Sequence, residues 1–555
     1  MKYHFYLFIG FFLCSFSLGA QNFKTLVDQL GSELQVVENI QVQVAQTIQE
    51  VQPGVVNIKQ ISTKIKDGTS TEEEFIFNLS DIDINTIRTT TIKDVIYVQL
   101  LVTRKQKMVQ NITNKQKTSY VDAVQVLAKN IDNGRSLVDL FKKMVPVAVE
   151  ITEKRLSLKT YEDHLQWLVK NVMEVGQAEK KITQKLSTTS GIVGRVELVQ
   201  EEITDKKTIQ KGFYFNLANI HANAILLETK GELAFLTVET RRKLKTIKTT
   251  TSGETGNYVA EFVLYCESIE KARDLQKVLK EVIPLAEKKV EESIPKVTTF
   301  SKGLSLLNDY IKLIESKESA VHQNFDGNCL SQFKRKEVAV SKTIEELFDF
   351  NWSDLQKNNI KFGTKGKQVF IEIGTKSGDK YIKQTLNGEP KSYTDKIELL
   401  FNEVEDAQKT EAILFQMIEF CEKEELKIPN TNAEILKQLA QKIQKVVLGK
   451  TTYDQYFSVI DDKTVQIKLV DVTDKTSKEK VFEFNIHDIN PVSVQFNTSG
   501  LNVLVQIKTN YLEKIIKYYE DGAIKNYQNA ITLQATDVEN ARQLVALFKK
   551  LATKK

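Results

Sequence analysis

The stretch Phe75-Ile76-Phe77-Asn78-Leu79-Ser80-Asp81-Ile82 occurs four times, with variations, along this chain of 555 residues. The other copies begin at Phe213, Phe348 and Phe482, and all follow the pattern Phe-x-Phe-Asn-apolar-x-Asp/Asn-apolar. The starts are 138, 135 and 134 residues apart, and each step is the length of one ordinary domain. The spacing therefore predicts four tandem modules, whose positions we number from the first Phe of each copy as position 0.

The four copies stay aligned without a gap as far as position 59. Position 34 is always β-branched, and position 59 is small and begins a helical pattern. Position 32 is always lysine and position 45 is always tyrosine. The lysines are Lys107, Lys245, Lys380 and Lys514, and the tyrosines are Tyr120, Tyr258, Tyr393 and Tyr527. Matches over this length indicate that the modules share one backbone plan.

Hydrophobic periodicity predicts both helices and strands within each module. Apolar residues recur at helical spacing over residues 22–52, which predicts one amphipathic helix that ends at Pro53. Segments 160–186, 299–314 and 431–447 have the same character, and we expect them to link the later modules. Short strands follow in each module, and a C-terminal helix begins near position 59. We therefore predict an α+β fold of four tandem repeats, each a small antiparallel β-barrel or sandwich closed by a C-terminal helix, with amphipathic linking helices.

Two predicted turns set the expected strand register. Asn387-Gly388 and Asp521-Gly522 separate the last two strands of their modules, and such dipeptides favour type I′ hairpin turns. This register places position 34 opposite position 45, so that Ile382 faces Tyr393. We also expect the Asp or Asn at position 6 to accept backbone hydrogen bonds and fix the turn after the Phe strand.

A unit of short antiparallel strands closed by one C-terminal helix resembles a pleckstrin-homology-like domain. The Phe-x-Phe-Asn-apolar-x-Asp motif is similar to one in uncharacterised exported proteins of Bacteroidota-type bacteria. Such folds usually bind peptides or phosphoinositides, although the basic loop used for phosphoinositides is not recognisable here. Neither resemblance implies a catalytic residue, because a fold alone is weak evidence for function.

The first twenty residues have the pattern of a secretory signal peptide. Lys2 is followed by an apolar run and then by small residues up to Ala20, which predicts cleavage after Ala20 and export to the periplasm or cell surface. An uncleaved anchor is the alternative, but the apolar run is short for a bilayer. The predicted domains are a signal peptide at 1–20 and modules at 21–155, 156–292, 293–427 and 428–555. Pro146, Pro284, Pro295 and Pro429 are expected to mark the joints.

Charge and cysteine content limit the range of partners. Lys and Arg number 77 against 72 Asp and Glu, a net charge of +5 that does not indicate nucleic-acid binding. No later stretch is apolar enough to span a membrane, so we expect a protein or a cell-envelope component as partner. The mature chain keeps Cys266, Cys329 and Cys421, and Cys266 fits a buried free thiol. We therefore expect the modules to be held by their cores.

The invariant lysines and tyrosines listed above are the candidate ligand-facing positions. Together they would make a cationic and aromatic cradle for an anionic or sugar ligand. The simpler interpretation, which we favour, is that each tyrosine packs across the hairpin while each lysine keeps its ammonium in water. Asp81, Asp83 and Asn85 have the spacing of calcium ligands, but the required glycine and glutamate are missing, and a turn cap fits better.

The sequence contains no recognisable constellation for catalysis. None of the five histidines is paired at metal-ligand spacing, and no serine or cysteine has a neighbouring base. We therefore predict no catalytic, cofactor-binding or metal-binding residues. The preferred hypothesis is an exported, non-enzymatic binding or scaffold protein. A hydrolase or carbohydrate-active protein with a carboxylate pair is the alternative, because acid pairs leave no local signature, and a purely structural spacer is a third.

Overall fold

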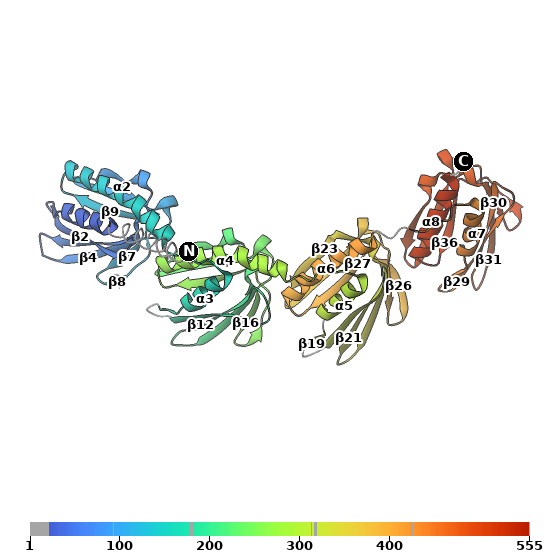
Figure 1. Ribbon diagram of the computed structural model, residues 1–555, viewed down its shortest axis with the longest axis horizontal. Helices are drawn as coiled ribbons and strands as arrows, with labels where there is room; N and C mark the ends of the chain where they lie inside the picture. Colours follow the sequence, from blue (N-terminus) through green and yellow to red (C-terminus); the bar gives the residue numbers. More distant parts are fainter. Residues whose placement is uncertain are drawn as a thin grey trace, which may run out of the picture. The chain divides into compact units, whose positions relative to one another are not determined.

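The structure is a computed structural model that describes residues 22–92, 94–176, 181–311, 313–315, 319–422 and 426–553. The predicted signal peptide lies outside the described residues. The chain divides into two compact units, Met1–Ser293 and Ile294–Lys555, each of which contains two modules. In every module a six-stranded and a three-stranded antiparallel sheet are followed by a C-terminal helix (Figure 1).

The first module begins with a helix at residues 22–33 and ends with helix α2, Ile131–Lys154. Its six-stranded sheet has the order β1-β2-β3-β4-β7-β8, and its three-stranded sheet has the order β5-β6-β9. The bounds are β1 Val37–Glu38, β2 Val42–Gln52, β3 Val55–Lys64, β4 Ser70–Asn78, β5 Arg88–Ile92, β6 Val95–Leu101, β7 Gln110–Thr113, β8 Gln116–Lys117 and β9 Ala123–Ala128.

The second module has the same strand order. Its larger sheet contains β10 Val175–Gly176, β11 Lys181–Thr188, β12 Arg195–Ile203, β13 Thr208–Asn216, β16 Lys248–Thr251 and β17 Glu254–Thr255. Its smaller sheet contains β14 Leu226–Lys230, β15 Leu233–Glu239 and β18 Glu261–Cys266. Its helices are α3 Tyr161–Asn171 and α4 Ile269–Glu292.

The third and fourth modules repeat the plan. The third contains α5 Phe300–Tyr310, β19 Ile314–Glu315, β20 Ser319–Gly327, β21 Leu330–Ala339, β22 Thr343–Asn351, β23 Leu355–Lys365, β24 Gln368–Thr375, β25 Ile382–Leu386, β26 Glu389–Thr394, β27 Lys396–Phe401 and α6 Val404–Cys421. The fourth contains α7 Asn432–Lys442, β28 Val446–Leu448, β29 Thr451–Val459, β30 Thr464–Val472, β31 Ser477–Asn485, β32 Gln495–Ser499, β33 Asn502–Lys508, β34 Lys517–Glu520, β35 Ala523–Ile524, β36 Ala530–Ala535 and α8 Val538–Thr553.

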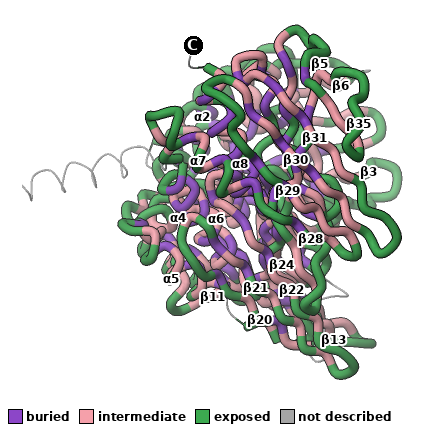
Figure 2. The backbone as a smooth tube through the Cα atoms, turned by 90° about the vertical axis from the view of Figure 1, so that its right-hand side faces the viewer, coloured by how far each residue is buried: buried purple, intermediate pink, exposed green. Residues whose placement is uncertain are grey.

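The α+β repeat architecture agrees with the prediction, but the modules do not form closed barrels. Within the described part of each module, the two sheets have separate hydrogen-bond ladders. The C-terminal helix packs on the smaller sheet, and buried residues run along the helices and strands while the hairpin turns are exposed (Figure 2). The core is therefore the apolar layer between the helix and the two sheets.

A glutamine side chain joins the two sheets in each module. Its amide nitrogen donates to the backbone carbonyl of one residue in the last strand of the smaller sheet, and its amide oxygen accepts from the backbone N–H of that same residue. The pairs are Gln46 with Leu127 at 2.9 and 2.8 Å, Gln184 with Tyr265 at 2.8 and 3.0 Å, Gln323 with Leu400 at 2.8 and 2.9 Å, and Gln455 with Gln534 at 2.8 and 2.9 Å. These amides fix the two sheets at one separation.

The predicted linking helices are too long at all four places, and in the segment 299–314 the helix α5 ends at Tyr310 before β19 begins at Ile314. The helix at 22–33 ends before β2, so the expected helix over 22–52 is wrong in its second half. Residues 42–52 pair with β3 in a hairpin, because polar and apolar residues alternate there closely enough to bury one face of a strand. The segments 160–186 and 431–447 likewise change to strands after α3 and α7.

Two of the four prolines do not mark joints. Pro146 and Pro284 lie inside the helices α2 and α4, whereas Pro295 and Pro429 lie in connections between elements.

The third module contains a disulfide in addition to its hydrophobic core. The bond joins Cys329 to Cys421, the last residue of α6. The expectation that cores alone hold the modules is therefore incomplete, while Cys266 is a buried free thiol as predicted.

The residue that caps the turn after the Phe strand is the asparagine at position 3. In each module its side-chain oxygen accepts the backbone N–H two residues later, as in Asn78 to Ser80 at 2.9 Å and Asn485 to His487 at 3.0 Å. The prediction that Asp81 caps this turn is wrong, because its carboxylate pairs with an arginine of the next module.

The predicted hairpin register holds next to the turn, where Gln384 pairs with Lys391, but it is wrong by one residue at positions 34 and 45. Asn387-Gly388 and Asp521-Gly522 have positive φ at both residues, as a type I′ turn requires. However, Ile382 pairs with Thr394, because the ladder is irregular between Ile382 and Gln384. A shift of one residue moves a side chain to the other face of the hairpin. The tyrosine at position 45 is therefore not the cross-strand partner of the residue at position 34.

Candidate functional site at the module junctions

Within each unit, the asparagine at position 3 and the aspartate at position 6 of the unit's first module meet the C-terminal helix of its second module. In the first unit the Arg273 guanidinium donates to both carboxylate oxygens of Asp81, at 2.7 and 2.5 Å. Asn78 donates to Glu270 at 3.1 Å. Burial raises the pKa of the Asp81 carboxyl, against the opposing effect of Arg273. Because desolvation offsets much of the attraction in such a pair, it fixes the register of the two modules more than it stabilises them.

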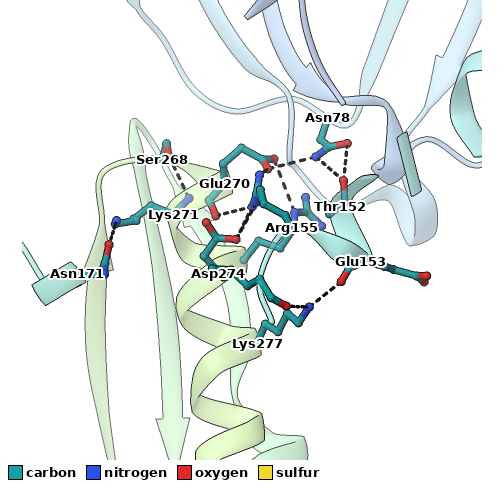
Figure 3. Close-up of polar contacts among 12 residues, drawn as sticks. Asn78, Thr152, Glu153, Arg155, Asn171, Ser268, Glu270, Lys271, Asp274 and Lys277 are labelled. Carbon is teal, nitrogen blue, oxygen red and sulfur yellow. Dashed lines mark hydrogen bonds and ion pairs between the residues drawn. The ribbon is translucent and has the colours of Figure 1, made fainter. Parts of the chain in front are cut away.

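A second arginine adds polar contacts at the same junction (Figure 3). Arg155, just after α2, donates to Glu270 at 2.8 Å and also forms an ion pair with Asp274. The Lys277 ammonium donates to the backbone carbonyl of Glu153 at 2.7 Å. The end of α2 is thus held by the side of α4 through four charged side chains.

The invariant tyrosine of the first module is part of the core of the second. Tyr120 is 4% exposed and clusters with the buried apolar residues of the second module. Burial, with a smaller effect from Cys266, raises its pKa to about 12. Its backbone N–H donates to the carbonyl of Gly231 at 3.3 Å, and the Thr229 hydroxyl donates to the carbonyl of Lys107 at 2.9 Å. The tyrosine and lysine positions therefore serve docking, the lysine through its backbone.

The same contacts occur between the third and fourth modules. Arg542 donates to both oxygens of Asp354 at 2.6 and 2.7 Å, and Asn351 donates to Glu539 at 3.0 Å. The backbone N–H of Tyr393 donates to Gly500 at 3.1 Å, and Thr498 donates to the carbonyl of Lys380 at 2.8 Å. Tyr393 joins the core cluster of the fourth module, and burial raises its pKa to about 12.

Both junctions thus join the same two surfaces, which we define by position. The Asp face comprises positions 3, 6, 32, 33 and 45, and the Arg face comprises positions 14, 16, 18, 57 and 60. Apolar contacts complete the match, because Tyr381 at position 33 packs on Phe496 at position 14, with ring centroids 4.9 Å apart. Met108 and Leu227 are the equivalent residues at the first junction, where Leu227 belongs to the core cluster of the second module and Met108 packs against that cluster.

The eight predicted ligand-facing residues do not form one cradle. All four lysines are exposed, while Tyr120, Tyr258 and Tyr393 are buried and Tyr527 is 45% exposed. The structure places these residues on the Asp faces of their modules. Sequence reasoning missed the arginine at position 60 and the acidic residue at position 57, although both recur at fixed spacing in the second and fourth modules.

A cavity of about 710 Å³ lies beside the second of these junctions. It is lined by residues of both the third and the fourth module, including Tyr381, Tyr393 and Lys383. Its acidic lining residues are Asp326, Asp349, Asp537 and Glu539. A cavity of this size and polarity suits a small polar ligand that carries cationic or hydroxyl groups and an apolar surface for the tyrosines.

Two observations concern metal ligation and thiol reactivity in the described part of the chain. No cluster of three or more His, Cys, Asp or Glu side chains suitable for a metal ion occurs among the described residues. Burial raises the pKa of the Cys266 thiol to about 12, so it remains protonated at neutral pH. No helix in the described ranges is both long and apolar enough to cross a membrane.

Searches of protein-family models, of curated proteins and of solved structures find no match to the chain.

Proposed function

We propose that this chain is an exported, non-enzymatic scaffold of the cell envelope, and that it binds a protein or another envelope component through its module junctions. The observation that carries the proposal is the recurrence of one docking contact, Asp81 with Arg273 and Asp354 with Arg542. The invariant polar residues are used to join modules, which is the use expected in a repeat scaffold. The Cys329–Cys421 disulfide supports an oxidising compartment such as the periplasm.

We further propose that each module is of the pleckstrin-homology-like type. Two antiparallel sheets followed by a C-terminal helix support this assignment, although the separate ladders depart from a closed barrel. The cavity between the third and fourth modules is the proposed contact site for the partner, because aromatic and charged side chains of two modules converge there.

The test is a pull-down from cell-envelope extract with the chain from residue 21 onward as bait. We expect one component to be enriched and to be lost with the variant Asp349→Lys, which places a cation at the cavity. The matched control is Asp474→Lys, an exposed residue in the turn after β30. Failure of a folded bait to enrich any component, or equal enrichment by both variants, would overturn the proposed site.

A hydrolase or carbohydrate-active protein is the second candidate, and it is favoured by the carboxylates that line the same cavity. Two acidic side chains across a bound sugar are the minimal machinery for glycoside hydrolysis. A screen of envelope glycans, with Asp349→Asn and Asp537→Asn as paired knock-outs, distinguishes the candidates. Activity that both substitutions remove would replace the scaffold proposal.

A further inference from the structure

The fourth module keeps an Asp face that is not occupied by any described residue. Asp488 stands at position 6, equivalent to Asp81 and Asp354, and Asn485 stands at position 3. Within the described ranges, the Asp488 carboxylate has no ion pair and no side-chain hydrogen bond, whereas its two equivalents each hold an arginine. The Asp488 carboxylate of this module therefore has no arginine partner among the described residues.

The apolar part of this Asp face is also exposed. Tyr527 at position 45 is 45% exposed, against 4% for Tyr120 and 7% for Tyr393. Ile515 stands at position 33, where Met108 and Tyr381 pack on the next module, and it too is exposed. Leu512 on the neighbouring turn adds further exposed apolar surface. Exposed apolar side chains at positions that are covered at the two junctions indicate a surface suited to a protein partner.

The first module keeps the complementary Arg face. Arg135 stands at position 60, equivalent to Arg273 and Arg542, and it pairs with Asp132 at 3.1 Å. The docked arginines make the same contact three residues back, at 3.6 Å for Arg273 with Glu270 and 3.5 Å for Arg542 with Glu539. Arg135 is thus arranged like its docked equivalents but remains exposed.

The exposed fraction of the side chain at position 56, at the edge of this Arg face, differs most between the first module and the docked modules. Ile131 of the first module is 57% exposed, whereas Ile269 of the second is 7% and Val538 of the fourth is 6% exposed. Thr91 at position 16 retains the hydroxyl that Thr229 and Thr498 donate at the two junctions. The first module differs at position 14, where Thr89 replaces the apolar Leu227 and Phe496, and at position 18, where Lys93, which lies outside the described residues, replaces Gly231 and Gly500.

The charges at the two outer faces are complementary. The sequence has Asp488 on the fourth module and Arg135 on the first, the same pair of residue types that joins modules within each unit. The inner positions of the second and third modules have instead the uncharged Asn219 and Gln408. Asp thus stands at position 6 in every module but the second, and Arg stands at position 60 in every module but the third.

We propose that the Asp face of the fourth module binds the Arg face of the first module of a second copy, so that the chains associate head to tail. Asp488 of one copy pairs with Arg135 of the next, and Tyr527 packs beside Ile131. Such an interface uses two different surfaces, so it produces an open chain of molecules or a closed ring. Thr89 makes it less apolar than the internal junctions, and the association lacks their covalent linkage, so we expect it at micromolar concentrations.

Sedimentation velocity of the chain from residue 21 onward, over a hundredfold range of concentration, tests this proposal. We expect the weight-average mass to rise with concentration and to fall with added salt, because an ion pair contributes to the contact. The single variants Asp488→Arg and Arg135→Asp each present two like charges to the other copy, and we expect each to be monomeric. Asp474→Arg, which makes the same charge change in a hairpin turn outside the Asp face, should associate as the unchanged chain does.

Mixing the two single variants gives the sharpest test. Each retains one intact face, and the two intact faces fit each other, while the two altered faces carry exchanged and again complementary charges, so the mixture should associate into species larger than a dimer. The double variant, with the charges exchanged, should associate into larger species again. A chain that stays monomeric throughout, or an association that neither single variant changes, would overturn the proposal, and binding of the same surface to another protein would then take its place.

Discussion

At the residue scale, the acidic residue at position 6 has a different role from the one its sequence suggests. In the sequence it follows a strand and looks like a turn cap, and nothing local distinguishes it from the asparagine three residues earlier. The turn needs only one cap, which Asn78 supplies, so Asp81 is available to the neighbouring module. A partner that lies 192 residues further along the chain leaves no local pattern.

The ion pair between Asp354 and Arg542 should contribute measurably to docking of the third and fourth modules. Asp354→Ala leaves Arg542 partly buried without its partner, and we expect a loss of about 1–3 kcal/mol in docking free energy. Hydrogen exchange of the segment around Tyr393 measures it, because that backbone N–H is bonded to Gly500 only in the docked state. The matched control is Asp488→Ala at the same position of the fourth module, which should leave this exchange unchanged in dilute solution.

Docking should also weaken at high pH through the buried tyrosines. The folded pKa of Tyr120 and Tyr393 is about 12, above the ordinary value of 10.0. A group whose pKa is raised on folding contributes stability that is complete below its unfolded pKa and is lost as the pH rises through its folded pKa. We therefore expect a loss of up to about 2–3 kcal/mol per tyrosine between pH 10 and 12.

Absorbance at 295 nm records this titration, because tyrosinate absorbs there and tyrosine does not. The variants Tyr120→Phe and Tyr393→Phe should each lack the absorbance change of one tyrosine in the high-pH part of the titration, near the folded pKa of about 12. Loss of that amplitude from the early part instead would show that the tyrosine is accessible to solvent.

At the element scale, the glutamine that joins the two sheets is the feature most easily missed. Gln46 and Gln455 lie in strands that otherwise alternate, and a buried glutamine there resembles an ordinary polar residue. Its partner is the backbone of a strand about eighty residues later, an interaction that no side-chain pattern records. Periodicity assigned Gln46 to a helix, and both the strand that holds it and the contact between the sheets had to come from the structure.

Replacing this glutamine should loosen one module. Gln455→Leu removes both hydrogen bonds to Gln534, so that the backbone N–H and carbonyl of Gln534 have fewer partners. This should lower the free energy of unfolding by about 2–3 kcal/mol. Urea unfolding of the full chain, followed by hydrogen exchange in β36, locates the effect in the fourth module. Gln495→Leu, at an exposed position of β32, should stay within about 0.5 kcal/mol of the parent. Equal effects of both substitutions would contradict this role.

The disulfide should make the third module sensitive to reduction. It closes a loop of 92 residues, and the chain-entropy model assigns such a bridge about 4.6 kcal/mol. We expect the double variant Cys329→Ser with Cys421→Ser to lower the unfolding temperature of the third module, and reduction of the parent by dithiothreitol to do the same. Reduction of the double variant should have no further effect, because Cys266 is a free thiol. An unfolding temperature that is the same with and without the bridge would contradict this expectation.

At the scale of the whole molecule, the repeat was predictable because every copy must fill the same core. Phe215 and Phe484 are buried for the same reason in different modules, and such shared demands keep four sequences aligned. The junctions were less predictable, because a surface is defined by residues from several elements. The invariant tyrosine was predicted to pack across its own hairpin, whereas the one-residue register shift and the core clusters place Tyr120 and Tyr393 against the next module.

The recurrence of the Asp81–Arg273 junction as Asp354–Arg542 also bears on how the chain arose. If single copies had been added one after another, every junction would have the same ancestry and no reason to alternate. The charged pair instead returns with every second copy, which fits a two-module ancestor whose gene was duplicated as a whole. Recombination that inserts or deletes two modules together would keep each Asp face next to a matching Arg face. We therefore expect natural length variants of this chain to contain an even number of copies.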